Sequence, residues 1–175
     1  MRLTNLLPTF ISTAFRLSEA ATPNPPGFTY LFTANVTLEP AINMGVGPYG
    51  QRVAIPIIGG TFTFSPLARL SFLPSMASRG SKADKNAKGT ILNLGADWGW
   101  TDTHNPSGVS TFHPDTRYQL RTSDGANIFI QTEGPAQTDG TIHLREKFET
   151  GSADYYWMNN IVAVGILKAG SGSVM

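Results

Sequence analysis

The sequence contains no cysteine among its 175 residues. Disulfide bonds, thiolate catalysis and cysteine-based metal sites are therefore excluded. Histidine is scarce as well, since His104, His113 and His143 are the only three and their spacing matches no metal-binding motif. We therefore expect this protein to use neither a metal nor another cofactor.

Charged side chains are also few, at 14% of the residues, and the formal net charge is +1. Binding to nucleic acid requires a basic surface, and attraction to a membrane surface requires a strong field of one sign. This composition supplies neither. We expect no nucleic-acid partner and no membrane association.

The N-terminal region, residues 1–27, differs from the rest of the chain. Its apolar residues are interrupted by Thr4, Asn5 and Pro8, and no clear cleavage site follows, so it makes a poor signal peptide. We expect an arm that packs on the domain or on a partner subunit, a proline-rich linker over 23–27, and a cytoplasmic location. One domain then covers residues 28–168, and a Gly/Ser-rich flexible tail covers 169–175.

The domain shows the pattern of short strands joined by turns. Apolar and polar residues alternate over 30–38, β-branched residues are dense over 52–58, and Gly59 and Gly60 permit a bend. An Asp124-Gly125 turn joins strands over 116–122 and 127–131. Further strands are expected over 67–73, 91–100, 143–148 and 155–167, with a mobile loop over 76–89. About eight to ten strands and no convincing amphipathic helix predict an all-β antiparallel sandwich or closed barrel.

Asp97 lies between Gly95 and Trp100 and directly before Trp98, so it stands beside two of the chain's three tryptophans. Burial near indole rings would raise the pKa of its carboxyl toward that of a general acid. Strand alternation, however, places Asp97 and Trp98 on opposite faces unless a bulge resets the phase. A structural role at a turn or strand end is the alternative.

Several short runs stand in order along the chain, at residues 50–52, 55–62, 95–98, 117–122 with 124–126, 148–151 and 156–159. Together they resemble domain-of-unknown-function family 3237 (DUF3237). The resemblance covers about residues 28–167 and implies a closed single barrel of the lipocalin or streptavidin kind, with a central cavity. It also implies homo-oligomers, dimers or tetramers. The loop over 76–89 and the long arm depart from the family pattern, and both could reshape the mouth of the cavity.

Some fungal members of the family resemble cyclases of natural-product pathways, which add a phenol hydroxyl across a prenyl alkene to close an oxygen ring. The resemblance thus implies a small aromatic or prenylated substrate. Protonating an alkene needs a protonated acid and aromatic faces beside the developing cation. Asp97 is the first choice for this acid, with Glu149 and Glu133 next, while Arg52 and Arg117 could hold the phenol oxygen. The predicted catalytic residues are Asp97, Arg52 and Glu149; the predicted substrate contacts are Trp98, Arg117, Tyr118, Glu133, Tyr156 and Asn159.

Three alternatives stay open at this point. Arg52 or Arg117 could pair with Asp97 or Glu149, which would lower the pKa of the acid and spoil it as a proton donor. The barrel could carry an apolar molecule without catalysis. The chain could also be an assembly protein whose arm and aromatic surface serve oligomerisation.

Overall fold

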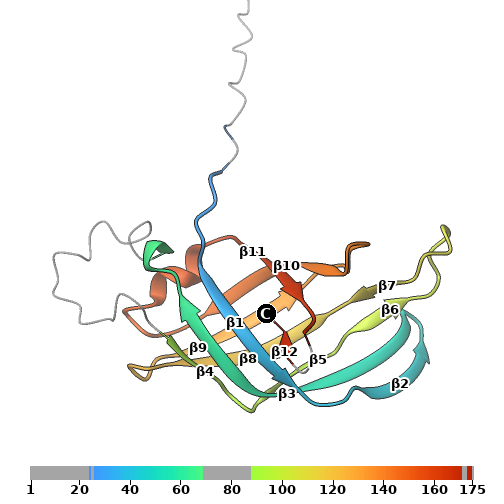
Figure 1. The fold of residues 1–175 in the computed structure, drawn as a ribbon, viewed down its shortest axis with the longest axis horizontal. Helices are drawn as coiled ribbons and strands as arrows, with labels where there is room; N and C mark the ends of the chain where they lie inside the picture. The colour runs from blue at the N-terminus through green and yellow to red at the C-terminus, as the bar shows by residue number, and fades with distance from the viewer. Residues whose placement is uncertain (1–23, 25, 69–87, 171–172, 175) are drawn as a thin grey trace, which may run out of the picture.

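A long antiparallel sheet curls around one core in the computed structural model, which describes residues 24, 26–68, 88–170 and 173–174 (Figure 1). The main path through the sheet runs β11-β10-β9-β8-β4-β3-β1-β12, and β2, β5, β6 and β7 pair beside it. The predicted all-β barrel is confirmed. The strands are β1 (Phe32–Leu38), β2 (Ile42–Gly47), β3 (Gly50–Phe64), β4 (Lys88–Ile91), β5 (Gly95–Asp97), β6 (Trp100–Asp102), β7 (Thr111–His113), β8 (Asp115–Thr122), β9 (Asn127–Glu133), β10 (Thr141–Glu149), β11 (Ala163–Lys168) and β12 (Ser173–Val174).

The β8–β9 hairpin shows why these segments form a half-buried sheet. Gly125 has a φ of 90°, which the tight turn requires and which glycine adopts without steric cost. Tyr118 and Leu120 are buried while Arg117 and Arg121 lie on the other face, as their alternation predicts. Ile128 and Ile130 continue the buried face on β9, so the hairpin contributes the centre of the core.

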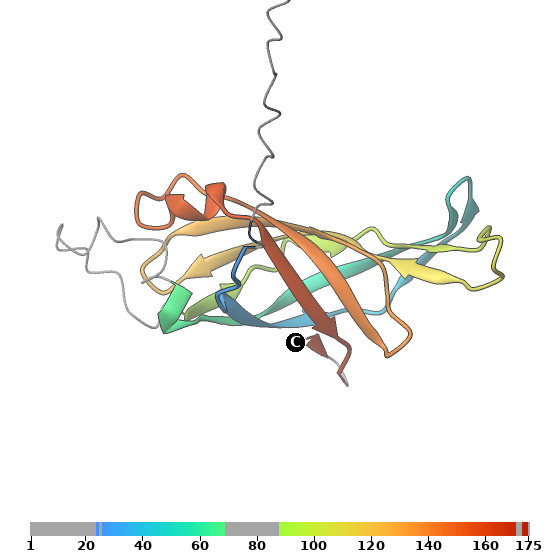
Figure 2. The ribbon, with the colours of Figure 1, turned by 90° about the horizontal axis from the view of Figure 1, so that it is seen from above.

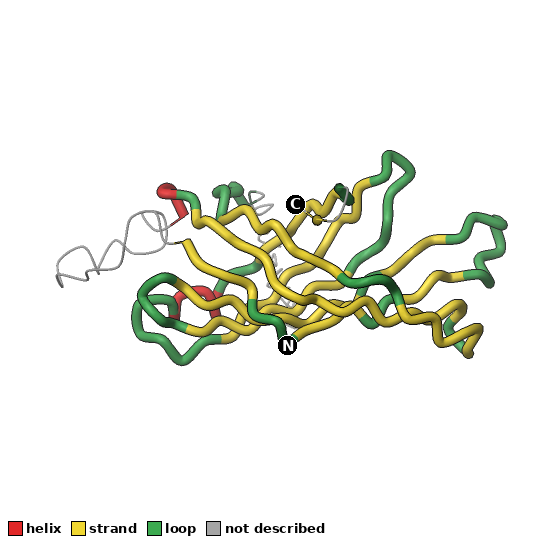
Figure 3. The backbone as a smooth tube through the Cα atoms, turned by 60° about the horizontal axis from the view of Figure 1, so that its bottom comes forward, coloured by secondary structure: helices red, strands yellow, loops and turns green. Residues whose placement is uncertain are grey.

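Strand β3 is the longest strand and belongs to two parts of the molecule. Its first half joins β2, β6 and β7 in an extension at one end, and its second half pairs with β1 and β4 (Figures 2 and 3). The predicted bend at Gly59 and Gly60 occurs within this strand, where φ is 151° and 138°. The register with β1 shifts between Thr37 and Leu38, whose partners are Gly59 and Ile57, so β3 contains a bulge there. Pro56 pairs with β5, and its carbonyl accepts a hydrogen bond from the backbone N–H of Glu39.

Three predicted strands differ from the structure. The strand expected over 91–100 is divided among β4, β5 and β6, because the sheet partners change along it. Residues 66–68 form a helical turn rather than the start of a strand, and 69–73 lie outside the described residues. The strand expected over 155–167 begins as the 3-10 helix η1 (Tyr156–Asn160), and only its second part is β11.

The structure describes only part of the chain ends and of the long loop. The arm over 1–23 and most of the loop predicted over 76–89 lie outside the described residues, although Lys88 and Gly89 belong to β4. In the segment predicted as a flexible tail, β12 pairs with β1. No helix in the described part of the chain is long and apolar enough to cross a membrane.

Candidate active site

A cavity of about 580 Å³ opens where β1 and β11 face each other. No strand pairing joins these two elements within the described ranges, so the sheet leaves room at this seam. Mostly apolar residues of β1, of the segment before it (27–31) and of β11 form the wall, together with Tyr118, Leu144 and Glu146. A concave, mostly apolar cavity with a few polar groups is the usual form of a small-molecule site.

Glu146 is the acid of this cavity. It lies on the inward face of β10, between the buried side chains of Leu144 and Phe148. Burial raises the pKa of its carboxyl from 4.5 to about 7, because the apolar surroundings disfavour the charged form. None of the ion pairs among the described residues includes Glu146. It can therefore hold a proton near neutral pH.

Tyr118 is the predicted substrate contact that lies in this cavity. Its side chain is 6% exposed and lines the cavity with Glu146. Burial, and then the charge of Glu146, raise the pKa of the Tyr118 hydroxyl, so that the hydroxyl stays protonated and can donate a hydrogen bond. No hydrogen bond among the described residues uses this hydroxyl.

Asp97 and Glu146 lie at the two ends of one row across the barrel interior. Asp97 is the register partner of Thr116, Thr116 of Thr132, and Thr132 of Glu146. Directly paired residues of an antiparallel sheet share a face, so all four side chains belong to the inner layer. Both threonines are buried. This polar row explains how Asp97 can face inward without lining the cavity itself.

Asp97 is buried, at 8% exposure, and its Oδ1 accepts a hydrogen bond from the backbone N–H of Asp115 at 2.8 Å. Burial raises the pKa of its carboxyl to about 6, although the hydrogen bond from Asp115 partly opposes this. Neither Arg52 nor Arg117 forms an ion pair with it. The carboxylate thus secures the start of β8 against β5, and no arginine lowers its pKa.

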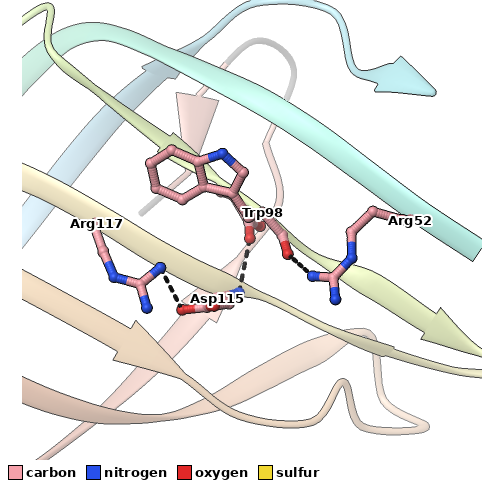
Figure 4. A network of polar contacts seen from close by, with 5 residues as sticks. Arg52, Trp98, Asp115 and Arg117 are labelled. Atoms are coloured by element: carbon pink, nitrogen blue, oxygen red, sulfur yellow. Dashed lines mark hydrogen bonds and ion pairs between the residues drawn. The ribbon is translucent and has the colours of Figure 1, made fainter. Parts of the chain in front are cut away.

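The two arginines instead lie on either side of Trp98, on the outer surface (Figure 4). Arg52 donates a hydrogen bond to the Trp98 carbonyl at 2.6 Å. Arg117 pairs with Asp115 at 3.1 Å, and its guanidinium carbon lies 5.7 Å from the Trp98 ring centroid. Trp98 contacts Arg117 while Asp97 shares the inner face with Thr116, so the two neighbours point in opposite directions, as alternation predicts. None of these outer groups lines the cavity.

The remaining predicted residues also lie away from the cavity wall. Glu149 is exposed at the end of β10, and Glu133 forms an exposed pair with Arg145 at 3.3 Å. Tyr156 is exposed on η1. Asn159 accepts from the Thr150 N–H at 2.8 Å and donates to the Thr150 carbonyl at 2.9 Å, so its amide holds η1 against the end of β10.

Sequence reasoning missed Glu146, although a signal was present. Within the predicted strand over 143–148, Leu144, Glu146 and Phe148 share one face by alternation. A single acid among apolar residues on a core-facing strand is unusual, because burying a carboxyl is costly. Glu149 was predicted as a candidate acid because it stands next to a turn, but its side chain is exposed and faces outward.

No group of three His, Asp or Glu side chains lies close enough together to hold an ion within the described ranges. The cavity combines one acid, Glu146, with two phenols, Tyr30 and Tyr118, two threonines and apolar walls. Such a site suits an uncharged small molecule.

The fold and this cavity define a small antiparallel β-barrel with a ligand-sized cavity where β1 and β11 face each other. The chain belongs to the family described as protein of unknown function (DUF3237), whose model matches residues 26–174.

Known relatives include an enzyme. The hydroalkoxylation enzyme phnH from Penicillium herquei is 28% identical over 143 residues, which cover 82% of this chain and 75% of the relative. A β-barrel-like protein from Acinetobacter baumannii AYE is 29% identical, with a TM-score of 0.63 over 87% of this chain and 95% of the other. The crystal structure of an enzyme from Penicillium herquei shares the fold at 21% identity, with a TM-score of 0.55 over 89% of this chain and 95% of the other.

Proposed function

We propose that this protein is a cofactor-independent cyclase that closes an oxygen heterocycle by adding a hydroxyl group across an alkene of the same molecule. The observation that carries the proposal is Glu146, an acid in an apolar cavity whose pKa is raised to about 7. An acid with a pKa near the working pH is suited to proton transfer. The relationship to a hydroalkoxylation enzyme agrees with this chemistry.

In the proposed reaction, Glu146 gives its proton to one alkene carbon, and the other alkene carbon becomes cationic. The substrate hydroxyl oxygen then forms a bond to this carbon, and the proton that it loses returns to the Glu146 carboxylate. No atom is gained or lost, so the product is an isomer of the substrate. Tyr118 orients the substrate oxygen by a hydrogen bond. Phe32, which also lines the cavity, offers an aromatic face to the cation.

The proposal uses Glu146 as the acid in place of Asp97, because Glu146 lines the cavity and Asp97 does not. Arg52 and Arg117 have no part in it, so the substrate hydroxyl enters in its neutral form. A small aromatic or prenylated natural product fits the apolar wall and the cavity volume.

The test compares single-turnover rates on a prenylated phenol for the wild type, Glu146→Gln and Asp97→Asn, with exposed Glu39→Gln as the control. We expect Glu146→Gln to lower the rate by about a hundredfold or more, the size of a general-acid contribution. We expect Asp97→Asn and Glu39→Gln to change it far less. If Asp97→Asn abolishes turnover and Glu146→Gln does not, the assignment of Glu146 is wrong.

A non-catalytic carrier is the second candidate, favoured by the largely apolar wall of the cavity. A carrier would bind the same phenol without turning it over. Retention of binding in Glu146→Gln together with an unreactive wild type would support the carrier and refute the cyclase.

A further inference from the structure

The cavity exists because small residues occupy inward positions on both sides of the seam. Ala34 on β1 and Ala163 on β11 pack toward the core, and both line the cavity with Gly165. Along β11 the exposed residues alternate with them, since Val164 and Ile166 are 61% and 70% exposed. A larger side chain at any of these three inward positions would take up part of the cavity.

Gly165 has a more specific relation to the acid. A Cβ atom at Gly165 would come within 2.2 Å of Glu146 Oε1 and 2.9 Å of its Cδ. The Glu146 carboxyl therefore lies directly over the Cα of Gly165, on the neighbouring strand. The third nearest atom is Cγ of Glu146 at 3.4 Å, so the three atoms nearest to this Cβ all belong to the Glu146 side chain.

The backbone does not require glycine at this position. Gly165 is not among the described glycines with positive φ, whereas Gly60 has a φ of 138° and its Cβ would come within 2.1 Å of the Asn35 carbonyl oxygen. Gly60 is thus needed by the backbone itself. At Gly165 the space is occupied by one flexible carboxyl group, so an added methyl would move that carboxyl rather than the strand.

A second, independent feature points to a ligand beside this carboxyl. Tyr118 is 6% exposed, lines the same cavity, and its hydroxyl takes part in no hydrogen bond among the described residues. The hydroxyl oxygen is not among the fully buried polar atoms without a partner in the described part of the chain, so it remains accessible and can donate a hydrogen bond to a ligand oxygen in the cavity.

We propose that Gly165 is the residue that positions the Glu146 carboxyl and, with Ala34 and Ala163, keeps room beside it for the ligand. This inference rests on the proposed use of the cavity as the substrate site. Gly165 is a positioning residue, since it acts through Glu146. The ligand that this arrangement accepts is uncharged, because no Lys or Arg side chain lines the cavity and an anion would meet an acid there.

The first measurement follows the Glu146 carboxyl itself, by ¹³C NMR titration of the ¹³C-glutamate-labelled full chain. The signal is assigned with Glu146→Gln. In Gly165→Ala we expect the midpoint to fall by about half a pH unit or more, because the added methyl pushes the carboxyl toward the open cavity, where it is better hydrated. Gly151→Ala is the matched control, since a Cβ at Gly151 would meet no atom within 4 Å, and its midpoint should equal that of the wild type.

The second measurement is binding of N-phenyl-1-naphthylamine, an uncharged fluorescent probe. We expect Gly165→Ala to weaken binding by about fivefold or more, since the displaced carboxyl enters the ligand space, and Gly151→Ala to leave it unchanged. Ala34→Val, on the β1 side of the cavity and away from the directly paired Glu146 and Ala163, should weaken binding while leaving the NMR midpoint near that of the wild type. The two measurements together distinguish a shift of the Glu146 carboxyl from a simple loss of cavity volume.

A double-mutant cycle with Glu146→Ala covers the case in which Gly165→Ala folds poorly. Without the glutamate side chain there is nothing for the added methyl to displace, so Gly165→Ala should have no effect on the urea midpoint or on probe binding in this background. If Gly165→Ala remains damaging without Glu146, or if it leaves both midpoint and probe affinity of the wild type unchanged, the proposal is overturned. If a variant loses only its turnover of prenylated phenols, that result concerns the proposed reaction. The NMR midpoint, probe binding and urea unfolding require no turnover, so they test the role of Gly165 separately.

Discussion

The buried acid Glu146 predicts how the stability of this protein depends on pH. Its pKa is raised from 4.5 to about 7 in the folded state. Between these values the folded protein binds more protons than the unfolded chain, so the free energy of unfolding falls as the pH rises. The loss begins above pH 4.5 and is complete once the pH has passed through about 7. At 1.36 kcal/mol per pH unit, the rise corresponds to about 3 kcal/mol.

The perturbation is Glu146→Gln, which keeps the approximate size and shape of the side chain and removes its ionisable carboxyl group. Between pH 5 and pH 8 the wild type should lose about 2 to 3 kcal/mol more stability than the variant, because part of the loss already lies below pH 5. Asp97, whose pKa is raised to about 6, adds a loss of the same sign in both proteins, and it cancels in the comparison. The difference between the two proteins therefore isolates Glu146.

The assay is urea unfolding at pH 5, 6, 7 and 8, followed by tryptophan fluorescence. Glu39→Gln, at an exposed position, is the matched control and should follow the wild type at every pH. A constant difference between wild type and Glu146→Gln across this range would refute the reasoning, because it would mean that Glu146 ionises in the folded protein as it does in the unfolded chain.

Three further outcomes are expected from the fold. Gly60→Ala should destabilise by more than about 3 kcal/mol or prevent folding, since its Cβ would come within 2.1 Å of a carbonyl oxygen at a positive φ; circular dichroism and urea unfolding report this. Asn159→Ala should lower the free energy of unfolding by about 1 to 3 kcal/mol through the loss of two hydrogen bonds, while the exposed neighbour in Asn160→Ala should cost less than about 0.5 kcal/mol. If the two asparagine variants are equally stable, Asn159 does not hold η1 in place. Arg145→Ala should change stability by less than about 1 kcal/mol, because its pair with Glu133 is exposed, and a larger loss would contradict this.

Asp97 shows how far local reasoning can reach. Its orientation away from Trp98 follows from the strand pattern, and the structure agrees. Its burial and raised pKa come from the inner face of the sheet and not from the neighbouring indole ring, which lies on the outer surface. Its partners do not follow from the pattern. The backbone N–H of Asp115 and the buried Thr116 come from a strand that begins 18 residues later.

Alternation alone determined the class of the protein and the inward faces of its longer strands. A period of two assigns each residue to one of two faces, whatever the strand later pairs with. This is why the β8–β9 hairpin and the all-β class could be predicted, and why the alternation in β10 could have identified Glu146. The pattern left a sandwich or a barrel open, and the family resemblance implied the barrel. Where strands are three residues long and partners change, as in β5 and β6, no period is available and the prediction of one strand was wrong.

Only the tertiary structure decided where the site lies. The row from Asp97 to Glu146 depends on the register of four strands, and register is set by pairing between segments far apart in the chain. The cavity depends on the seam between β1 and β11 and on the small residues that face it there. Alternation can predict that Gly165 and Glu146 both face inward. Only the pairing of β10 with β11 places the Glu146 carboxyl over the Cα of Gly165.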